Sequence, residues 1–359
     1  MNQPPGLQPR SDIPRQMRAM RIHRTGPLSE TSPALSADLV AVPRPGTKQL
    51  LIEIQYCGVC HTELDEIEGR ASPPHLPVIP GHQVVGRVAA EGRDCELGLL
   101  DQCVGVAWIH SSCGHCHYCR SGAENLCASF QACGKDHDGG YAEYMVVAED
   151  FVHPIPAGIP PQQAAPLLCA GAVGYRSLSM TELASGSRLG LTGFGSSGRL
   201  MLQMALALNP QVLVFVFARS ESERQMALEL GASWAGDTAA SAPEPCDAII
   251  DTTPAWKPVL SALRQLAPGG RLVINAIRKE VGDRHLLSEL EYSEQLWMEK
   301  SVRSVANVTR ADVRGMLRLA AANEFSIDIQ EYALEDAQQA LRAIRSGDIR
   351  KSAVLNLRG

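Results

Sequence analysis

The chain has 359 residues, of which 45% are hydrophobic and 20% are charged, and its formal net charge at pH 7 is -6. A chain of this length can form two domains with separate cores, and its composition is that of an ordinary globular protein. The negative charge argues against a nucleic-acid partner, and no stretch approaches the roughly 18 apolar residues of a membrane-spanning helix. We therefore expect neither a nucleic acid nor a membrane as a partner.

The N-terminal segment is rich in proline and polar residues, and it lacks the apolar stretch of a secretory signal. We predict a disordered tail over residues 1–16. Because no targeting signal stands out, we expect a cytoplasmic protein.

Residues from 17 to about 103 predict a small β-rich domain. Strand-like runs at 17–23, 50–59 and 84–90 are separated by turns that contain Gly and Pro, and long helical periodicity is missing. The following segment, 111–138, is full of Cys, Gly and His but has little apolar content. Such a lobe cannot bury a core by itself and needs another source of stability.

After residue 165 strand-like and helix-like segments alternate. Runs rich in Val, Ile and Leu predict strands at 189–194, 212–218, 248–253 and 271–277, and periodic segments predict helices at 199–208, 222–232 and 262–270. This alternation predicts a parallel sheet covered by helices on both faces. The C-terminal segment again alternates helix and strand, and it ends in the strand-like run 352–357.

Eleven cysteines are many for a cytoplasmic chain, where they indicate metal or thiol chemistry more often than disulfides. Four of them follow a tight Cys-x2-Cys-x2-Cys-x7-Cys spacing within the lobe: Cys113, Cys116, Cys119 and Cys127. Four thiolates hold zinc with no open position, and the bound metal then stabilises the fold around it. We predict a structural zinc here; four free thiols and an iron–sulfur cluster are the alternatives.

A second set of possible ligands is scattered along the chain: Cys60, His82 and Cys169. Each could be an ordinary core or turn residue, and spacing alone cannot pair ligands so far apart. A catalytic zinc needs three protein ligands and one open position, which this set would provide. Cys57 and Cys60 also form a Cys-x2-Cys pair, for which a redox dithiol is the alternative.

A glycine-rich turn predicts a dinucleotide site. Gly193, Gly195 and Gly198 follow a predicted strand and open a predicted helix, the context in which such a turn binds a pyrophosphate. At the end of the next strand, Ala218 stands where NAD-binding proteins carry a carboxylate, and Arg219 and Ser220 follow it. These residues could accept a 2′-phosphate, so NADP(H) is favoured over NAD(H).

Six motifs, in their order along the chain, resemble those of the zinc-containing medium-chain dehydrogenase/reductase family: CGVCHTEL, PGHQVVGRV, the four-cysteine lobe, DGGYAEY, APLLCAGAVGY and GFGSSG. The resemblance is to alcohol dehydrogenases of the bacterial and yeast type. It implies an α/β protein with a GroES-like, β-rich catalytic domain at 17–170, completed by 312–359. A Rossmann cofactor domain with a doubly wound parallel sheet is implied at 171–311.

The resemblance also implies roles for single residues. Cys60, His82 and Cys169 resemble the ligands of the catalytic zinc, and the four lobe cysteines those of the structural zinc. Thr62 matches a hydroxyl that hydrogen-bonds the alcohol, and Trp108 matches a wall of the substrate pocket. His61 matches a contact to the cofactor pyrophosphate, and Arg310 matches a second phosphate contact.

Three residues depart from the family pattern beside the metal ligands. Gln83 replaces a Glu that follows the ligand histidine, Glu63 replaces an Asp that orients it, and Asp65 stands where the proton relay ends in a histidine. Protons could leave through His61, Asp65 or water.

We therefore expect a zinc-dependent alcohol dehydrogenase with two zinc ions per chain. It would move a hydride between a primary aliphatic or aromatic alcohol or aldehyde and NADP(H) or NAD(H), and it would form a homodimer or homotetramer. A polyol dehydrogenase on the same scaffold is one alternative. A catalytically impaired relative that binds zinc and nucleotide is the other, for which Gln83 is the only hint.

Overall fold

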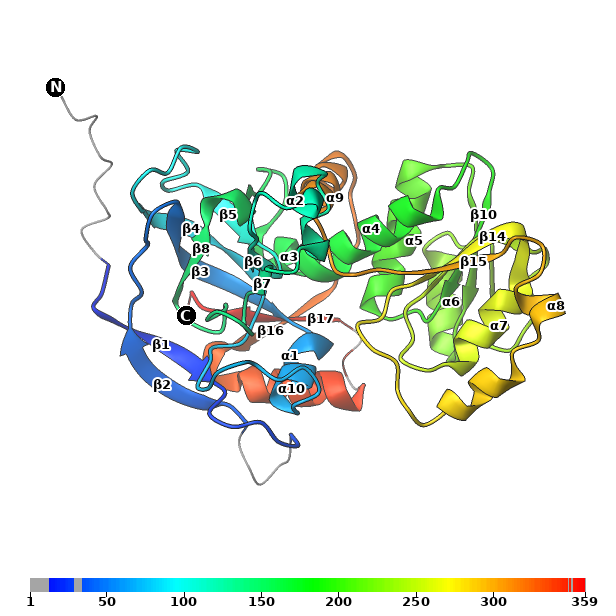
Figure 1. Cartoon of the computed structure of the whole chain (residues 1–359), viewed down its shortest axis with the longest axis horizontal. Helices are drawn as coiled ribbons and strands as arrows, with labels where there is room; N and C mark the ends of the chain where they lie inside the picture. The colour runs from blue at the N-terminus through cyan, green and yellow to red at the C-terminus, as the bar shows by residue number, and fades with distance from the viewer. Residues whose placement is uncertain (1–12, 29–33, 348, 350, 359) are drawn as a thin grey trace. The chain divides into compact units, whose positions relative to one another are not determined.

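The computed structural model describes residues 13–28, 34–347, 349 and 351–358 (Figure 1). Most of the predicted tail, residues 1–12, lies outside the described residues, and its last residue, Gln16, begins the first strand. The described residues divide into two compact units. The first unit comprises the described residues up to Cys169, the segment Thr309–Ala321 and the described residues from Ile327 onward. The second unit comprises Ala170–Val308 and Ala322–Ser326.

The first unit is built on a mixed sheet. Its strands, in the spatial order β16-β17-β3-β4-β5-β9 with β8 paired to β3, are β3 (Gln49–Val59), β4 (Gln83–Glu91), β5 (Cys103–Val106), β8 (Tyr144–Ala148), β9 (Val152–Pro154), β16 (Ile329–Ala333) and β17 (Ser352–Asn356). Two smaller antiparallel pairs are β1 (Gln16–Arg21) with β2 (Ser36–Ala41), and β6 (Ile109–Ser111) with β7 (Gln131–Ala132). The C-terminal strand β17 completes the sheet because it pairs with β3, far from it in sequence.

The helices of the first unit are short: α1 (His61–Ile67), α2 (His117–Arg120), α3 (Pro161–Pro166), α9 (Arg310–Ala322, of which the last residue counts with the second unit) and α10 (Ala337–Ser346). One core joins apolar side chains from β1, β3, β4, β5, α1, α10 and β17. The β-rich character predicted for this part of the chain is therefore observed.

The second unit contains a parallel sheet in the order β12-β11-β10-β13-β14-β15. Its strands are β10 (Arg188–Thr192), β11 (Leu213–Phe217), β12 (Trp234–Gly236), β13 (Cys246–Asp251), β14 (Leu266–Ile274) and β15 (Ser301–Ser304). The chain starts in the middle at β10, moves outward to β12, and then returns to build the other half from β13. This is the strand order of a doubly wound dinucleotide-binding sheet, and it confirms the predicted Rossmann architecture.

The helix α4 (Ala172–Thr181) precedes the sheet, and helices between its strands are α5 (Ser196–Leu208), α6 (Glu221–Glu229), α7 (Lys257–Gln265) and α8 (Tyr292–Gln295). The helix α7 packs Val259 and Leu263 onto a core that includes Phe217 of β11 and Ile249 of β13. None of the helices in the described part of the chain is both long and apolar enough to cross a bilayer.

One predicted helix was placed wrongly at its C-terminal end. The segment 262–270 was expected to be helical, but α7 ends at Gln265 and β14 begins at Leu266. Pro268 has no backbone N–H to continue a helix and disfavours the helical conformation at Ala267. Leu266 instead pairs with Cys246 of β13, so the parallel sheet takes over the segment.

Candidate active site

Three side chains that are far apart in the sequence meet in the first unit. The possible ligand atoms of Cys60, His82 and Cys169 all lie within 4.8 Å of one another, and Cys60 Sγ is 3.8 Å from His82 Nε2. Cys60 follows β3, His82 precedes β4, and Cys169 lies in a π-helical turn at Leu167–Gly171. The antiparallel pairing of Gly58 with Gln83 brings the first two together, because it places that end of β3 beside the start of β4.

A capping box at the start of α1 fixes one of these side chains. The Sγ atom of Cys60, the N-cap residue, accepts the backbone N–H of Thr62 at 3.4 Å. The carboxylate of Glu63 reaches back to the N–H of Cys60 at 2.9 Å, and its other oxygen lies 2.6 Å from His82 Nδ1. One buried carboxylate therefore caps the helix and orients the imidazole, so that Nε2 faces Cys60.

The surroundings of Cys60 and His82 shift the pKa values of both side chains. The pKa of the Cys60 thiol is raised well above its usual value, first by its hydrogen bond with Cys169 and then by burial. Burial is the largest single influence on His82 and by itself would lower its pKa, but the charges and hydrogen bonds of Glu63 and Cys60 together raise the pKa well above its usual value. A metal ion that binds such a set displaces protons, because thiolate and neutral imidazole are the ligand forms.

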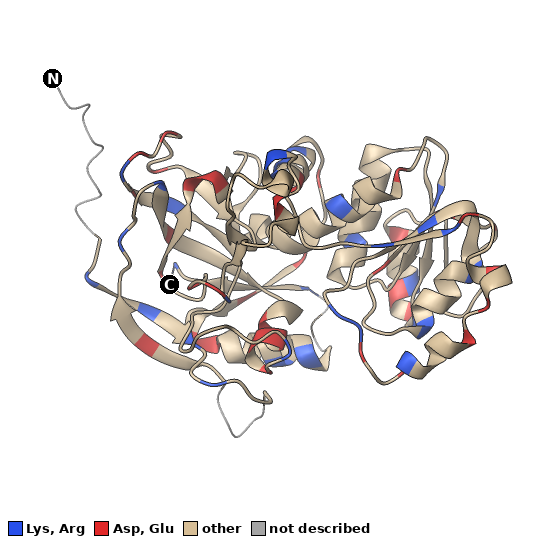
Figure 2. Cartoon of the chain, in the orientation of Figure 1, with Lys and Arg blue, Asp and Glu red and all other residues tan. Residues whose placement is uncertain are grey.

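The helix α1 also carries Asp65 and Glu66, and the ribbon of its acidic residues is red in Figure 2. Asp65 is buried and accepts a hydrogen bond from Nε of Arg70 at 2.5 Å. Glu66 is fully buried, and its carboxyl oxygens have no hydrogen-bond partner within the described residues. Burial raises the pKa of Glu66 well above its usual value, which favours the neutral acid.

The residues near the start of α1 differ in solvent exposure. His61 is exposed, whereas Thr62 is half-buried next to Cys60. Gln83, the first residue of β4, is buried, and a Cβ atom at Gly58 would lie only 2.5 Å from its Oε1. The absence of a side chain at Gly58 therefore makes room for the Gln83 amide.

Trp108 lies between β5 and β6 and packs against Phe130, with ring centroids 5.2 Å apart. Its buried Nε1 has no hydrogen-bond partner among the residues that the structure describes. The sequence did not predict Phe130 as a site residue because no motif includes it. Its position just after the last lobe cysteine was the available signal.

The four lobe cysteines form a second convergent set. The Sγ atoms of Cys113, Cys116, Cys119 and Cys127 all lie within 4.8 Å of one another. Cys113 Sγ is 3.8 Å from that of Cys119 and 3.6 Å from that of Cys127. In a tetrahedral site with Zn–S bonds of about 2.3 Å, sulfur atoms lie about 3.8 Å apart. The lobe therefore has the dimensions of a four-thiolate zinc site.

Backbone amides support the lobe sulfurs. The N–H of Cys116 donates to Cys113 Sγ at 3.4 Å, and the N–H of Ser129 donates to Cys127 Sγ at 3.4 Å. Hydrogen bonds from the backbone N–H groups of His115 and Cys116 lower the pKa of Cys113 to about 6. Donors of this kind stabilise thiolate, the form that binds metal.

The glycine turn lies in the second unit, between β10 and α5. Gly193 has φ 84°, and its N–H donates to the carbonyl of Phe217 at 2.9 Å. A Cβ at Gly198 would meet the carbonyl oxygen of Gly193 at 2.7 Å, so this glycine allows α5 to approach the strand. A Cβ at Gly195 would meet nothing within 4 Å, which leaves open space at the N-cap of α5. The three glycines thus play separate roles, and Gly195 faces the space where a phosphate could approach.

The end of β11 carries the residues expected at the adenosine ribose. Ala218 is buried, and Arg219 is exposed. Ser220 is the N-cap of α6, where its hydroxyl accepts the N–H of Glu223 at 3.2 Å. Arg224 Nη1 donates to the carbonyls of Ala218 and Arg219, which holds the backbone of the turn.

Arg310, a predicted phosphate contact, makes its described contacts in the first unit. Its backbone N–H and Nε both donate to Glu124 Oε1, at 2.8 and 3.0 Å, and its guanidinium lies 5.0 Å from the ring centre of Phe151. These contacts tie the start of α9 to the lobe. The phosphate contacts of His61 and Arg310 stay predictions.

Residues 46–157 match the model of a family described as the alcohol dehydrogenase GroES-like domain. A probable alcohol dehydrogenase of Mycobacterium tuberculosis is 42% identical over 349 residues, which cover 94% of this chain and 97% of the relative. The chain belongs to the zinc-type medium-chain alcohol dehydrogenase family.

Solved structures of other alcohol dehydrogenases have the same fold. A cinnamyl alcohol dehydrogenase from Sorghum bicolor superposes with a TM-score of 0.80 at 27% identity, covering 95% of this chain and 97% of the other. The structure of a protein named CAD from Helicobacter pylori, complexed with NADP(H), has a TM-score of 0.82 at 23% identity, and the match covers 95% of this chain and 98% of the other. The predicted family, the GroES-like and Rossmann fold, and the assignment as an alcohol dehydrogenase are confirmed.

Proposed function

We propose that this alcohol dehydrogenase holds a catalytic zinc through Cys60, His82 and Cys169, and interconverts primary alcohols and aldehydes with NADP(H). The observation that carries the proposal is the convergence of the three ligand atoms with His82 oriented by Glu63. For one cysteine and one histidine on a tetrahedral zinc, S and N lie about 3.6 Å apart, close to the 3.8 Å between Cys60 Sγ and His82 Nε2. When bound, zinc polarises the oxygen of the alcohol or carbonyl substrate.

The remaining steps belong to this chain's own residues. Thr62, half-buried and next to Cys60, would accept the proton of the substrate hydroxyl and pass it on. The carboxylate of Asp65 is held by Arg70, so we route the proton outward through the exposed His61 or solvent. Glu63 keeps His82 in the tautomer that presents Nε2 to the site.

A second zinc is proposed at Cys113, Cys116, Cys119 and Cys127, where it would stabilise the lobe 111–138. The sulfur separations and the amide donors support it. With no open ligand position, this site would bind no substrate.

The second unit is proposed as the cofactor domain and the first as the catalytic domain, as assigned from the sequence at 171–311 and at 17–170 with 312–359. The open space at Gly195 and the N-terminus of α5 would receive the pyrophosphate. Ala218 brings no carboxylate to the adenosine ribose, and Arg219 is exposed beside it. This arrangement suits a 2′-phosphate and supports the preference for NADP(H).

The substrate is proposed to be a primary alcohol with an aromatic or aliphatic side chain, bounded by Trp108 and Phe130. Their ring contact forms an apolar aromatic pair beside the lobe. The named activity of the Sorghum bicolor relative, a cinnamyl alcohol dehydrogenase, supports an aromatic substrate.

The test combines metal analysis with a cofactor-resolved assay. The purified protein should contain about two zinc ions per chain. It should reduce aromatic aldehydes with a higher kcat/KM for NADPH than for NADH. Cys60→Ser should lose turnover and about one zinc while it keeps its fold, and Cys103→Ser, a half-buried cysteine outside both clusters, should behave as wild type.

Other outcomes favour other readings. Retained turnover in Cys60→Ser would overturn the catalytic zinc site, and a clear preference for NADH would overturn the role of Ala218 and Arg219. Activity confined to polyols would favour the polyol dehydrogenase. Cofactor binding without turnover on any alcohol or aldehyde would favour an impaired relative.

A further inference from the structure

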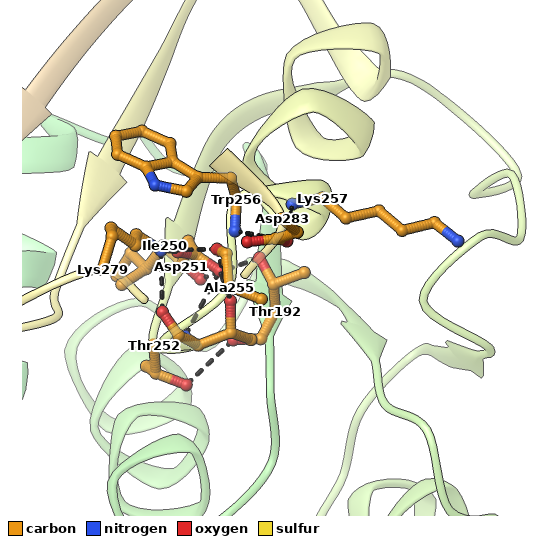
Figure 3. Close-up of polar contacts among 10 residues, drawn as sticks. Thr192, Ile250, Asp251, Thr252, Ala255, Trp256, Lys257, Lys279 and Asp283 are labelled. Atoms are coloured by element: carbon orange, nitrogen blue, oxygen red, sulfur yellow. Dashed lines mark hydrogen bonds and ion pairs between the residues drawn. The ribbon is translucent and has the colours of Figure 1, made fainter. Parts of the chain in front are cut away.

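A buried ion pair lies at the carboxyl end of β13, in the second unit (Figure 3). Asp251, the last residue of the strand, is fully buried, and the side chain of Lys279 is 8% exposed. Nζ of Lys279 donates to Asp251 Oδ2, to the carbonyl of Thr253 at 2.7 Å and to the carbonyl of Ala255 at 3.1 Å. All three hydrogens of the ammonium therefore form hydrogen bonds, two of them to backbone carbonyls.

This pair joins two loops. Lys279 follows β14, whereas Thr253 and Ala255 belong to the loop between β13 and α7. A second contact has the same effect, since Asp283 accepts the N–H groups of Trp256 and Lys257, both at 2.8 Å (Figure 3). Residues of the loop after β14 therefore hydrogen-bond to both ends of the loop over residues 252–256.

The loop over residues 252–256 also touches the glycine turn. The backbone N–H and the hydroxyl of Thr252 both donate to the carbonyl of Thr192, at 3.0 and 2.9 Å. A Cβ atom at the next residue, Gly193, would lie 2.6 Å from Thr252 Oγ1. The shape of the glycine turn therefore depends on where the loop holds Thr252.

The position of these contacts in the sheet gives them a function. The strands β10 and β13 are neighbours, and the chain leaves them toward opposite edges of the sheet. In open α/β sheets a ligand binds at the carboxyl ends of the strands at such a reversal. Thr192 and Asp251 are the last residues of these two strands, and Lys279 lies in the loop that follows the neighbouring strand β14.

Stability alone does not account for a buried pair here. Taking two charges out of water costs free energy that their attraction often does not recover, and well-packed apolar residues are frequently as stable. Burial raises the pKa of Asp251 even though Lys279 opposes the shift, so desolvation at this position is costly. What the pair supplies, and apolar side chains could not, is directional bonding to Thr253 and Ala255.

We infer that Lys279 and Asp251 are positioning residues for the nicotinamide dinucleotide: they hold the 252–255 loop and, through Thr252, the Gly193 turn in the shape that receives the cofactor. The inference rests on the proposed role of the second unit as cofactor domain. It predicts that the pair sets cofactor affinity without touching the catalytic chemistry of the first unit.

The test is Lys279→Met, with Lys300→Met as a matched control. Lys300 is half-buried and, like Lys279, donates to two backbone carbonyls, those of Leu263 at 2.9 Å and Glu294 at 2.8 Å. It precedes β15, so it lies at the amino ends of the parallel strands, away from the glycine turn. Both variants thus lose two bonds to backbone carbonyls, at opposite edges of one sheet, and Lys279→Met also loses the ion pair with Asp251.

Lys279→Met should raise the Kd and KM for NADPH by about tenfold while kcat changes much less, because lost preorganisation weakens binding. Lys300→Met should lower the melting temperature but leave the Kd for NADPH unchanged. The backbone amides of Thr252, Thr253 and Ala255 should exchange hydrogen faster in Lys279→Met than in wild type, without any cofactor. Folded Lys279→Met with wild-type Kd, or an equal rise in Kd in Lys300→Met, would overturn the inference.

If Lys279→Met does not fold, Asp251→Asn takes its place, since it keeps an acceptor for the Thr253 hydroxyl and removes only the charge. The same rise in Kd is expected, and an unchanged Kd counts against the inference. Wild-type protein that binds neither NADPH nor NADH would overturn the proposed function itself. Wild-type binding with unaltered variants would overturn only the positioning role.

Discussion

The carboxylate of Glu63 lies 2.6 Å from Nδ1 of His82, both side chains being buried. The same carboxylate accepts the backbone N–H of Cys60 at 2.9 Å. Two of the three proposed zinc ligands are therefore held by one side chain from the first turn of α1. The longer arm of Glu63, compared with the Asp expected from the family, allows it to cap the helix and reach the imidazole together.

Glu63→Gln should weaken zinc binding at the catalytic site by about 10–100-fold, because a neutral amide is a poorer partner for the imidazole N–H. Zinc content after dialysis against graded chelator measures this. Glu66→Gln is the control: Glu66 lies on the same helix, is equally buried, and has no hydrogen-bond partner among the described residues. Equal zinc loss in both variants would show that α1 acts only through general packing.

Cys116→Ser should release the zinc of the lobe and lower the melting temperature, because the metal stabilises a segment with little apolar core. Cys116 is also the N-cap of α2, and its Sγ accepts the backbone N–H of Cys119 at 3.5 Å. The expected zinc content falls by about one ion per chain, while the site at Cys60 keeps its metal. An unchanged melting temperature and zinc content would contradict a structural metal.

Gly195→Ala should leave the fold intact and weaken cofactor binding. No atom lies within 4 Å of the added Cβ, and Gly195 has φ −74°, which any residue can adopt. The methyl group would instead enter the space proposed for the pyrophosphate, and the KM for NADPH should rise about tenfold or more. Gly158→Ala, equally free of neighbours within 4 Å, is the control and should retain the wild-type KM. A wild-type KM in Gly195→Ala would place the cofactor elsewhere.

Asp247→Asn should destabilise the second unit at neutral pH and much less in acid. Three hydrogen bonds from Arg188, at 2.8 to 3.1 Å, lower the pKa of Asp247 in the folded state. The contribution of the pair is therefore present above the unfolded pKa of about 3.9 and is lost as the pH falls through the lower folded value. Because the pair is partly exposed, we expect a difference of about 1 kcal/mol at pH 7.

Urea unfolding of wild type and Asp247→Asn at pH 7 and near pH 3 measures this difference. Acid also releases zinc, but it does so from both proteins, so the comparison between them is unaffected. A gap between the two that stays constant with pH would show that the carboxylate charge contributes nothing.

Local sequence patterns were enough to determine several features. The four lobe cysteines lie so close in the sequence that any compact folding of residues 111–138 brings their sulfur atoms together. The glycine turn and the alternating strands and helices after residue 165 depend on short-range conformational preferences, and a parallel sheet covered by helices could be predicted from them.

The tertiary structure decided what depends on distant partners. Cys60 and His82 meet because Gly58 pairs with Gln83 across β3 and β4, and no local pattern sets that register. The end of α7 at Gln265 likewise depends on the pairing of Leu266 with β13. The sequence suggested Asp65 as a possible proton exit and gave Asp251 no role, whereas folding placed Arg70 and Lys279 against them. Ion pairs and strand registers are interactions between segments, and their geometry exists only once the chain has folded.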